Sequence, residues 1–232
     1  MLRSIVFTIS LFVAALCNAS SVVYWSFESP NVPPSTTGSA ISGILPATGS
    51  GSASGFHDAA TTSYSSGVGN GSLQALTANS WNPGDYWQFQ FSTLGFTGIN
   101  LDWDMTSSVT GPTNFLVSFS TDGVNFTLPG FPDAVADPNP PATWNSSTAN
   151  SASHFSRDLS SFTELDNAAT VYIRLECQTP SILFFGPNGI NSVDNFRVSD
   201  TSAIVPEPSS MGLFGTMLAA AVLRRRVSFA KC

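Results

Sequence analysis

The chain has 232 residues, with 8 Lys and Arg against 15 Asp and Glu and a net charge of −7. Residues 20–205 hold three of the basic and fourteen of the acidic residues, so this part carries −11. Such a charge argues against nucleic acid and anionic membranes as partners, because both are bound through Lys and Arg. The 18 phenylalanines and 5 tryptophans argue against a disordered chain, because disordered segments contain few aromatic residues.

The N-terminus has the three parts of a secretory signal peptide. Arg3 supplies a positive charge, residues 5–16 form an apolar run, and small residues precede Ser20. The run is too short to be a good membrane span. We therefore expect a signal peptide at residues 1–19 and a mature chain that begins at Ser20. An acylated lipoprotein N-terminus and a buried N-terminal helix are the alternatives.

Alternation of apolar and polar residues predicts β-strands through the middle of the chain. In residues 85–91, for example, the aromatic residues at every second position share one face. Further strands are expected at 22–27, 99–105, 169–177 and 192–198, with a hairpin at 114–128 that turns at Asp122-Gly123. Residues 30–64 and 129–150 are rich in Pro, Ser, Thr and Gly and are expected to be long loops.

Short strands separated by Gly, Pro, Asn and Asp turns predict an all-β sandwich. Inward aromatic residues on several strands can fill the ~10 Å gap between two sheets. We expect a jelly roll over residues 20–203 rather than an immunoglobulin-like sandwich, because the sequence has no Cys-Trp-Cys framework. Cys177 lies in an alternating strand pattern and is expected to be a buried core thiol.

The segments WSFES (25–29) and SVDNFRV (192–198) resemble the first and last strands of carbohydrate-binding-module-like jelly rolls. The resemblance implies a structural calcium ion held by Glu28 and Asp194, which would pin these two strands together. Ca²⁺ takes hard oxygen ligands from carboxylates and backbone carbonyls. The alternative is that both residues are solvated carboxylates, and no other cofactor is expected.

Candidates for catalysis are few. Asp102 and Asp104 share one strand face and could hold a cation or act as acid and base, although a solvated polar face explains both. The histidines are His57, expected in a flexible loop, and His154. There is no Gly-x-Ser-x-Gly nucleophile motif and no Cys/His metal cluster, so we expect that the protein is not an enzyme.

Aromatic residues that face solvent could stack against a sugar. Trp87 and Trp103 fall on inward strand faces, where core packing is their expected role. Trp81, Tyr86 and Trp144 lie in loops or on outward faces and are the candidate ligand residues. Packing at the rim of the domain is the alternative for each of them.

The C-terminus combines a rigid Pro-Glu-Pro, an apolar run and an arginine cluster. These are Pro206, Glu207 and Pro208, residues 209–223, and Arg224, Arg225 and Arg226. As a helix the apolar run would be about 22 Å long at 1.5 Å per residue, which is marginal for a bilayer core of about 30 Å. Clustered arginines beside such a run are expected on the cytoplasmic side.

This combination resembles the PEP-CTERM sorting signal of bacteria, over residues 204–232. The resemblance implies that exosortase, a membrane protease-transpeptidase, recognises Pro206, Glu207 and Pro208 and releases or re-attaches the protein at the cell surface. The chain departs from many such tails by ending in Cys232. An ordinary weak membrane anchor is the alternative.

Together these features predict an exported bacterial surface or extracellular-matrix protein with a structural or adhesive role and a membrane-anchored precursor. A carbohydrate-binding module that recognises a glycan is the alternative, and a glycan-active hydrolase is a third possibility. The expected partners are an exosortase-type protease, the membrane through the C-terminal helix, and an extracellular polysaccharide.

Overall fold

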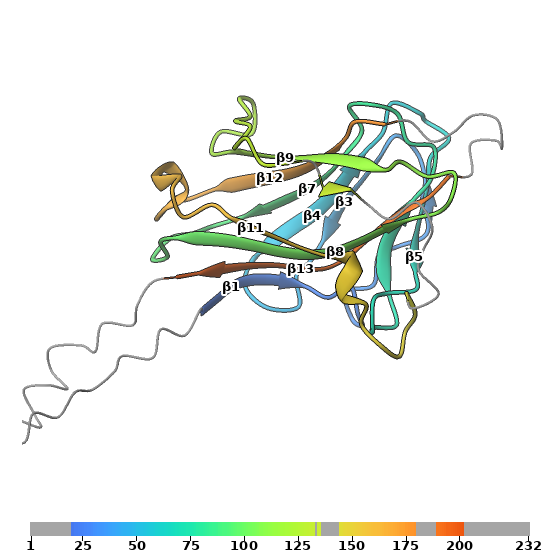
Figure 1. Cartoon of the computed structure of the whole chain (residues 1–232), viewed down its shortest axis with the longest axis horizontal. Helices are drawn as coiled ribbons and strands as arrows, with labels where there is room; N and C mark the ends of the chain where they lie inside the picture. Colours follow the sequence, from blue (N-terminus) through green and yellow to red (C-terminus); the bar gives the residue numbers. More distant parts are fainter. Residues whose placement is uncertain (1–19, 133, 136–143, 180–188, 202–232) are drawn as a thin grey trace, which may run out of the picture. The chain divides into compact units, whose positions relative to one another are not determined.

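The computed structural model describes residues 20–132, 134–135, 144–179 and 189–201. These residues form two layers of antiparallel β-sheet, a β-sandwich (Figure 1). The expected signal peptide at 1–19 and the C-terminal segment 204–232 lie outside the described residues. Within the described ranges, no helix has the length and apolar character needed to cross a membrane.

One layer, sheet A, has seven strands. In spatial order they are β11 (His154–Asp158), β8 (Ile99–Ser107), β13 (Asn191–Asp200), β6 (Ala75–Ala78), β5 (Ser63–Gly67) and β2 (Thr36–Thr37), while β1 (Ser20–Trp25) also pairs with β13. Strand β13 therefore has β8 along one edge and both β1 and β6 along the other. The first and last strands lie side by side, as Figure 1 shows.

The other layer, sheet B, has six strands. In spatial order they are β10 (Ala134–Val135), β9 (Asn114–Ser120), β12 (Val171–Cys177), β7 (Tyr86–Phe91), β4 (Gly51–Phe56) and β3 (Ala40–Ile44). Two short 3-10 helices, η1 (Ser151–Ser153) and η2 (Thr163–Leu165), lie in the connections. The expected strands at 22–27, 85–91, 99–105, 169–177 and 192–198 correspond to β1, β7, β8, β12 and β13 and are confirmed.

Aromatic residues from both sheets fill the core. Phe89 of sheet B stacks on Phe196 of sheet A, with ring centroids 3.5 Å apart, and Trp25 packs edge-on against both. Trp87 and Trp103 are fully buried, which confirms the inward faces expected for them. Each large apolar side chain buried in this way contributes roughly 1.5–3 kcal/mol, so these rings are a main source of the sandwich's stability.

The expectation of a long loop at residues 30–64 is wrong, because the segment holds β2, β3, β4 and the start of β5. Strand β4 reads GSASGF and shows no apolar alternation, since its residues are almost all small. The small residues make room for the core: a Cβ atom on Gly55 would lie 2.6 Å from the ring of Trp87. Glycine is therefore needed at position 55, where β4 pairs with β7 directly beside Trp87.

The turn expected at Asp122-Gly123 is present, but the second arm of the hairpin is not a strand. The Asp122 carboxylate accepts hydrogen bonds from the backbone N–H of Val124 and of the next residue, both at 2.8 Å, which closes the turn. Phe119 and Thr127 then form an isolated bridge through two backbone hydrogen bonds. In the described part of residues 129–150, the regular structure is confined to β10.

Cys177 is fully buried, which confirms the core thiol expected from its strand pattern. Burial raises the pKa of this thiol to about 12. Its Sγ donates a hydrogen bond to the Thr179 carbonyl at 2.8 Å. The thiol is the unreactive form at neutral pH, so Cys177 serves packing.

Candidate functional site

The residues expected to direct sorting lie outside the described residues. They are Pro206, Glu207, Pro208, Arg224, Arg225 and Arg226. Within the sandwich, four places bring together side chains that could bind a ligand or an ion.

The two carboxylates expected to share an ion hold one loop between them. Asp194 Oδ2 accepts hydrogen bonds from the Asn70 backbone N–H at 2.8 Å and from Ser72 Oγ at 2.6 Å. Glu28 Oε1 accepts one from the Gln74 backbone N–H at 2.7 Å. The structure therefore brings Glu28, which follows β1, and Asp194, which lies in β13, to the same loop, residues 69–74.

Asp194 is the more buried of the two carboxylates. Its side chain is fully buried, and burial raises its pKa to about 7. No group of three or more His, Cys, Asp or Glu side chains in the described part of the chain could hold a metal. An ion between Glu28 and Asp194 would therefore need carbonyl and hydroxyl oxygens of the loop, which Ca²⁺ accepts as ligands.

The expectation that Trp81 is exposed is wrong. Its side chain is 1% exposed, and its Nε1 donates to the Ala78 carbonyl at 3.0 Å. The ring packs edge-on against His57, 4.1 Å between centroids, and against Trp87. Because its large apolar ring is buried against other rings and its N–H is satisfied, Trp81 belongs to the core and presents no face to a ligand.

His57 was expected in a flexible loop and is instead fully buried. Its Nδ1 lies 3.0 Å from the Tyr64 hydroxyl. Burial lowers the pKa of His57 to about 4, because the charged form loses its hydration. The ring is therefore neutral at pH 7, and the 3.9 Å approach of its Nε2 to Asp85 is not an ion pair.

Tyr86 does lie on an outward face, where it takes part in a stack across sheet B. Its ring stacks on Phe56 with centroids 5.4 Å apart. The Arg174 guanidinium lies between Tyr86 and Phe126, with Cζ 3.9 Å and 3.7 Å from the two ring centroids. Arg174 Nε also donates to Gln88 Oε1 at 2.8 Å. We call Phe56, Tyr86, Arg174 and Phe126 the sheet B stack.

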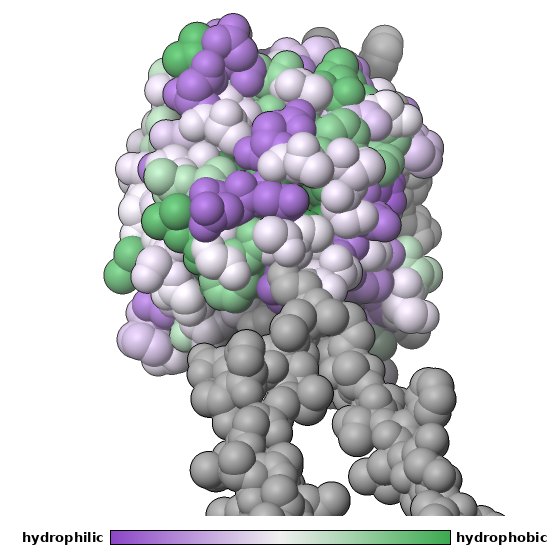
Figure 2. All heavy atoms as spheres, turned by 90° about the vertical axis from the view of Figure 1, so that its left-hand side faces the viewer, coloured by the Kyte–Doolittle hydropathy of each residue, from purple (hydrophilic) through white to green (hydrophobic). Residues whose placement is uncertain are grey.

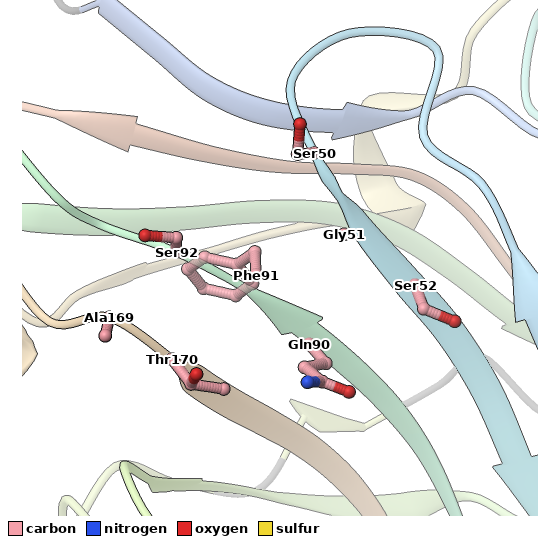
Figure 3. Close-up of a pocket in the computed structure, with 8 residues that line it drawn as sticks. All are labelled: Ser50, Gly51, Ser52, Gln90, Phe91, Ser92, Ala169 and Thr170. Carbon is pink, nitrogen blue, oxygen red and sulfur yellow. The ribbon is translucent and has the colours of Figure 1, made fainter.

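The cross-strand register adds rows of polar residues beside this stack. One row is Ser54, Gln88, Arg174 and Ser118, and the next is Ser52, Gln90, Tyr172 and Ser120. At the end of the second row lies a hollow of about 250 Å³. Figure 3 shows Ser52, Gln90 and Thr170 around it, from β4, β7 and the segment just before β12. The outer face of sheet B therefore offers aromatic rings beside hydrogen-bonding groups.

Trp144 is partly exposed and borders a hollow on the outer face of the other sheet. Its Nε1 donates to the Val68 carbonyl at 2.9 Å, which fixes the ring against the neighbouring loop. Of the three aromatic candidates, Tyr86 and Trp144 therefore reach the surface and Trp81 does not. Tyr86 lies in sheet B and Trp144 lies in a loop beside the outer face of sheet A, so the structure does not join them in one site.

The carboxylates Asp102 and Asp104 lie in a polar cleft on sheet A whose other members the sequence did not indicate. Strand β11 places His154 opposite Asp104, and His154 Nδ1 lies 2.8 Å from Asp104 Oδ1 and Nε2 lies 3.6 Å from Asp102. Asn195, at a bulge in β13 with φ of 50°, donates to Asp104 Oδ2 at 2.9 Å. The Tyr24 hydroxyl donates to the Asn195 side chain at 2.6 Å.

This cleft differs from the solvated face that was the simple alternative. Asp104 is only 5% exposed, because neighbouring strands cover it. The residues come together through strand pairing between distant segments and through a bulge, which re-aims a side chain. Neither leaves a local pattern in the sequence, so His154, Asn195 and Tyr24 could not have been grouped in advance.

The surface as a whole is mixed. On the face drawn in Figure 2, hydrophobic residues lie in small groups separated by hydrophilic ones. Single exposed apolar residues are normal on soluble domains. The candidate binding surfaces of this sandwich are therefore the places where aromatic and polar side chains are ordered.

The comparisons with known proteins concern the tail and the fold separately. No curated protein matches the chain. Solved structures with a similar sandwich include the CBM22-2 xylan-binding domain of Paenibacillus barcinonensis Xyn10C, at 12% identity and a TM-score of 0.41, covering 78% of this chain and 99% of that one.

Two other similar structures are a cleaved adhesin domain of Lys-gingipain and a carbohydrate-binding module. The adhesin domain, from Porphyromonas gingivalis, is 13% identical, with coverages of 76% and 96% and a TM-score of 0.39. TmCBM61, solved with β-1,4-galactotriose, is 7% identical, with coverages of 54% and 70% and a TM-score of 0.32. With TM-scores below 0.5, these likenesses carry no argument about function.

A family model described as the PEP-CTERM protein-sorting motif matches residues 205–226. The match confirms the resemblance seen in Pro206, Glu207 and Pro208, the apolar run and the arginine cluster. The motif implies export, sorting to the cell surface and processing by an exosortase. The chain is thus a β-sandwich protein that carries a C-terminal PEP-CTERM sorting motif.

Proposed function

We propose that this protein is an adhesive component of the bacterial envelope or extracellular matrix, and that it contacts a neutral polysaccharide through the outer face of sheet B. In this proposal residues 1–19 are removed on export, the sandwich is a jelly roll, and residues 209–223 anchor a precursor in the membrane. The sheet B stack is the observation that carries the proposal.

The stack is an ordered surface. Arg174 is held by a hydrogen bond to Gln88 and by two aromatic rings, each contact of this kind contributing about 0.5–1 kcal/mol at an exposed site. A surface ordered before binding loses little conformational entropy when a ligand arrives. Phe56, which is 42% exposed, ends the stack and leaves an aromatic ring available to a partner.

The chemistry of this face suits sugars. A sugar ring presents C–H groups that pack on aromatic rings and hydroxyls that bond to Gln, Ser and Arg side chains. The net charge of the chain, −7, disfavours a polyanionic partner. The sheet B stack also supports the second candidate function, a carbohydrate-binding module with one preferred glycan.

Adhesion can be tested on the full-length protein displayed by its host. We expect Phe56→Ala and Arg174→Ala each to reduce retention of the host's extracellular polysaccharide by about tenfold. This corresponds to a loss of about 1.4 kcal/mol of binding free energy. Leu94→Ala is the matched control, since it removes another exposed apolar side chain away from the stack. Wild-type retention in both stack variants would exclude this face.

A glycan array with the same proteins separates the two candidate functions. Binding to many neutral glycans supports adhesion, and binding to one supports a specific module. The hydrolase, which we do not favour, predicts release of sugars that stops when Asp102 and Asp104 are changed to Asn.

A further inference from the structure

A second hollow lies on the outer face of sheet A, on the opposite side of the sandwich from the sheet B stack. Its volume is about 310 Å³, at the lower end of the range for small-molecule sites. The residues that line it and carry the argument are Val68, Thr77, Thr106, Trp144, Ile190 and Ser192. Trp144 and two aliphatic residues form its apolar part, and hydroxyl groups form the rest.

The hydroxyls lie in one row across three strands. Ser192 of β13 pairs with Thr77 of β6 on one side and with Thr106 of β8 on the other. Thr77 Oγ1 and Ser192 Oγ are 2.9 Å apart and hydrogen-bonded. Outward-facing residues of neighbouring strands in register lie side by side, so the row offers several donors and acceptors within a short span.

Thr106 is the unusual member of this row. It is 5% exposed, and its buried Oγ1 has no hydrogen-bond partner among the described residues. Buried hydroxyls in native proteins are nearly always paired, and leaving one unpaired costs free energy. Thr106 lines the hollow, so rotation of its side chain about χ1 would turn this covered hydroxyl toward a ligand hydroxyl, which would supply the partner that the protein does not.

Hydrogen bonds hold Trp144 in place as one wall of the hollow. Besides its own hydrogen bond to Val68, the next residue, Asn145, accepts a hydrogen bond from the Gly71 backbone N–H at 2.8 Å. The loop around Gly71 is in turn fixed by Asp194 through Ser72. A tryptophan positioned in this way loses little freedom when a ring packs on it.

We infer that this hollow binds a single neutral pyranose ring, with one face of the sugar on Trp144 and its hydroxyls on Thr106 and its neighbours. An aromatic wall beside hydroxyls matches the two kinds of surface that a pyranose presents. The carboxylates of Asp104 and Asp194 lie opposite each other in the adjoining row of the same sheet face, which disfavours an acidic sugar. The site is separate from the sheet B stack, so either assignment can fail alone.

The test uses the full chain in a zwitterionic detergent, because sugar-headed detergents would compete. Methyl β-glucopyranoside and methyl β-galactopyranoside are titrated, with tryptophan fluorescence and saturation-transfer NMR as readouts. We expect saturable binding of at least one with a Kd on the order of millimolar, as for small ligands with few contacts. Trp144→Ala should abolish it.

Thr106→Val is the decisive variant, since it keeps the shape of the side chain and removes the hydroxyl. We expect binding to weaken about tenfold while the melting temperature stays equal or rises, because an unpaired buried hydroxyl is removed. Leu94→Ala, which removes an exposed apolar side chain that lines neither site, is the matched control and should leave pyranose binding unchanged. The effect of Phe56→Ala on polysaccharide retention reports on the sheet B stack.

Three results would overturn the inference. One is no binding of either pyranoside to the wild type up to about 100 mM, far above the expected Kd. Another is equal binding by wild type and Thr106→Val. The third is equal binding of cyclohexanol to both proteins with no preference for a pyranoside, which would make the hollow an apolar pocket only.

Discussion

Glu28 and Asp194 hold the same loop from opposite ends of the sandwich sequence. Glu28 accepts a hydrogen bond from the Gln74 backbone, and Asp194 accepts from Asn70 and Ser72. Because Glu28 follows β1 and Asp194 lies in β13, the loop joins the first strand to the last. The link therefore lies at the end of the β1–β13 pair that is remote from Ser20 and Asp200, where the chain enters and leaves the sandwich.

Calcium should stabilise this link if Glu28 and Asp194 share an ion. We expect chelation to lower the melting temperature, because a ligand that binds only the native state stabilises it by mass action, by about 2.7 kcal/mol at 100 times its Kd. Thermal unfolding with calcium and with EDTA measures the effect.

Glu28→Gln is the control, since the amide keeps an oxygen for the Gln74 N–H but removes a charged ligand. In that variant the two melting curves should coincide, and Asp194→Ala should behave in the same way. If the wild-type curves coincide as well, both carboxylates act only as hydrogen-bond acceptors for the loop.

His57 should make the protein less stable in mild acid. Its pKa is about 4 in the folded protein and about 6.5 when unfolded, so the unfolded state binds more protons between these values. The contribution of His57 to stability is therefore fully present above about pH 6.5 and falls as the pH drops to 4, by up to about 3 kcal/mol. Asp194, whose pKa is raised to about 7, contributes with the opposite sign in the same window, so the His57 slope is the difference in urea unfolding between the wild type and a His57 variant at several pH values.

His57→Gln isolates the contribution, because glutamine does not titrate. The difference in unfolding free energy between wild type and variant should shrink or change sign as the pH falls through this window. A difference independent of pH would show that the buried ring takes up its proton without penalty.

The mature protein should begin at or near Ser20, because small residues precede it after a short apolar run. N-terminal sequencing or intact-mass measurement of protein recovered from the envelope or medium of the native host gives the answer. A mature chain that begins at Met1 would mean that residues 1–19 are not a cleaved signal.

Pro206, Glu207 and Pro208 should be needed for processing and not for membrane insertion, since they precede the apolar run. Changing all three to Ala should cause a full-length precursor to accumulate in the membrane of the native host. Changing the arginines at 224–226 to Gln should instead weaken retention or disturb topology, because clustered arginines set orientation. A blot of fractionated cells follows both the size and the location of each form.

A host without an exosortase is the control, and there the wild type and the triple-Ala protein should look alike. Equal maturation of the two in the native host would contradict recognition of Pro-Glu-Pro. In that case the segment would be only a rigid spacer before the apolar run.

The sequence by itself determined the strands whose residues alternate and the order of the sorting motif. Alternation is local: in β12 every second residue is buried, and the seven residues of the strand suffice to show it. The sorting motif is likewise contiguous, since its three parts lie within residues 205–226. The sequence did not predict strand β4. This strand runs close to Trp87, so it is built of small residues and shows no alternation of apolar and polar residues.

Only the tertiary structure decided which side chains meet. Trp81 seemed to be a surface residue from its loop position but is buried in the core, since burial depends on what the rest of the chain packs above it. The register of β8 against β13 places Thr106 in a row of hydroxyl groups. A turn brings Phe126 against Arg174. Register and loop packing join residues far apart in sequence, and no local pattern records them, so the sites follow from the folded chain alone.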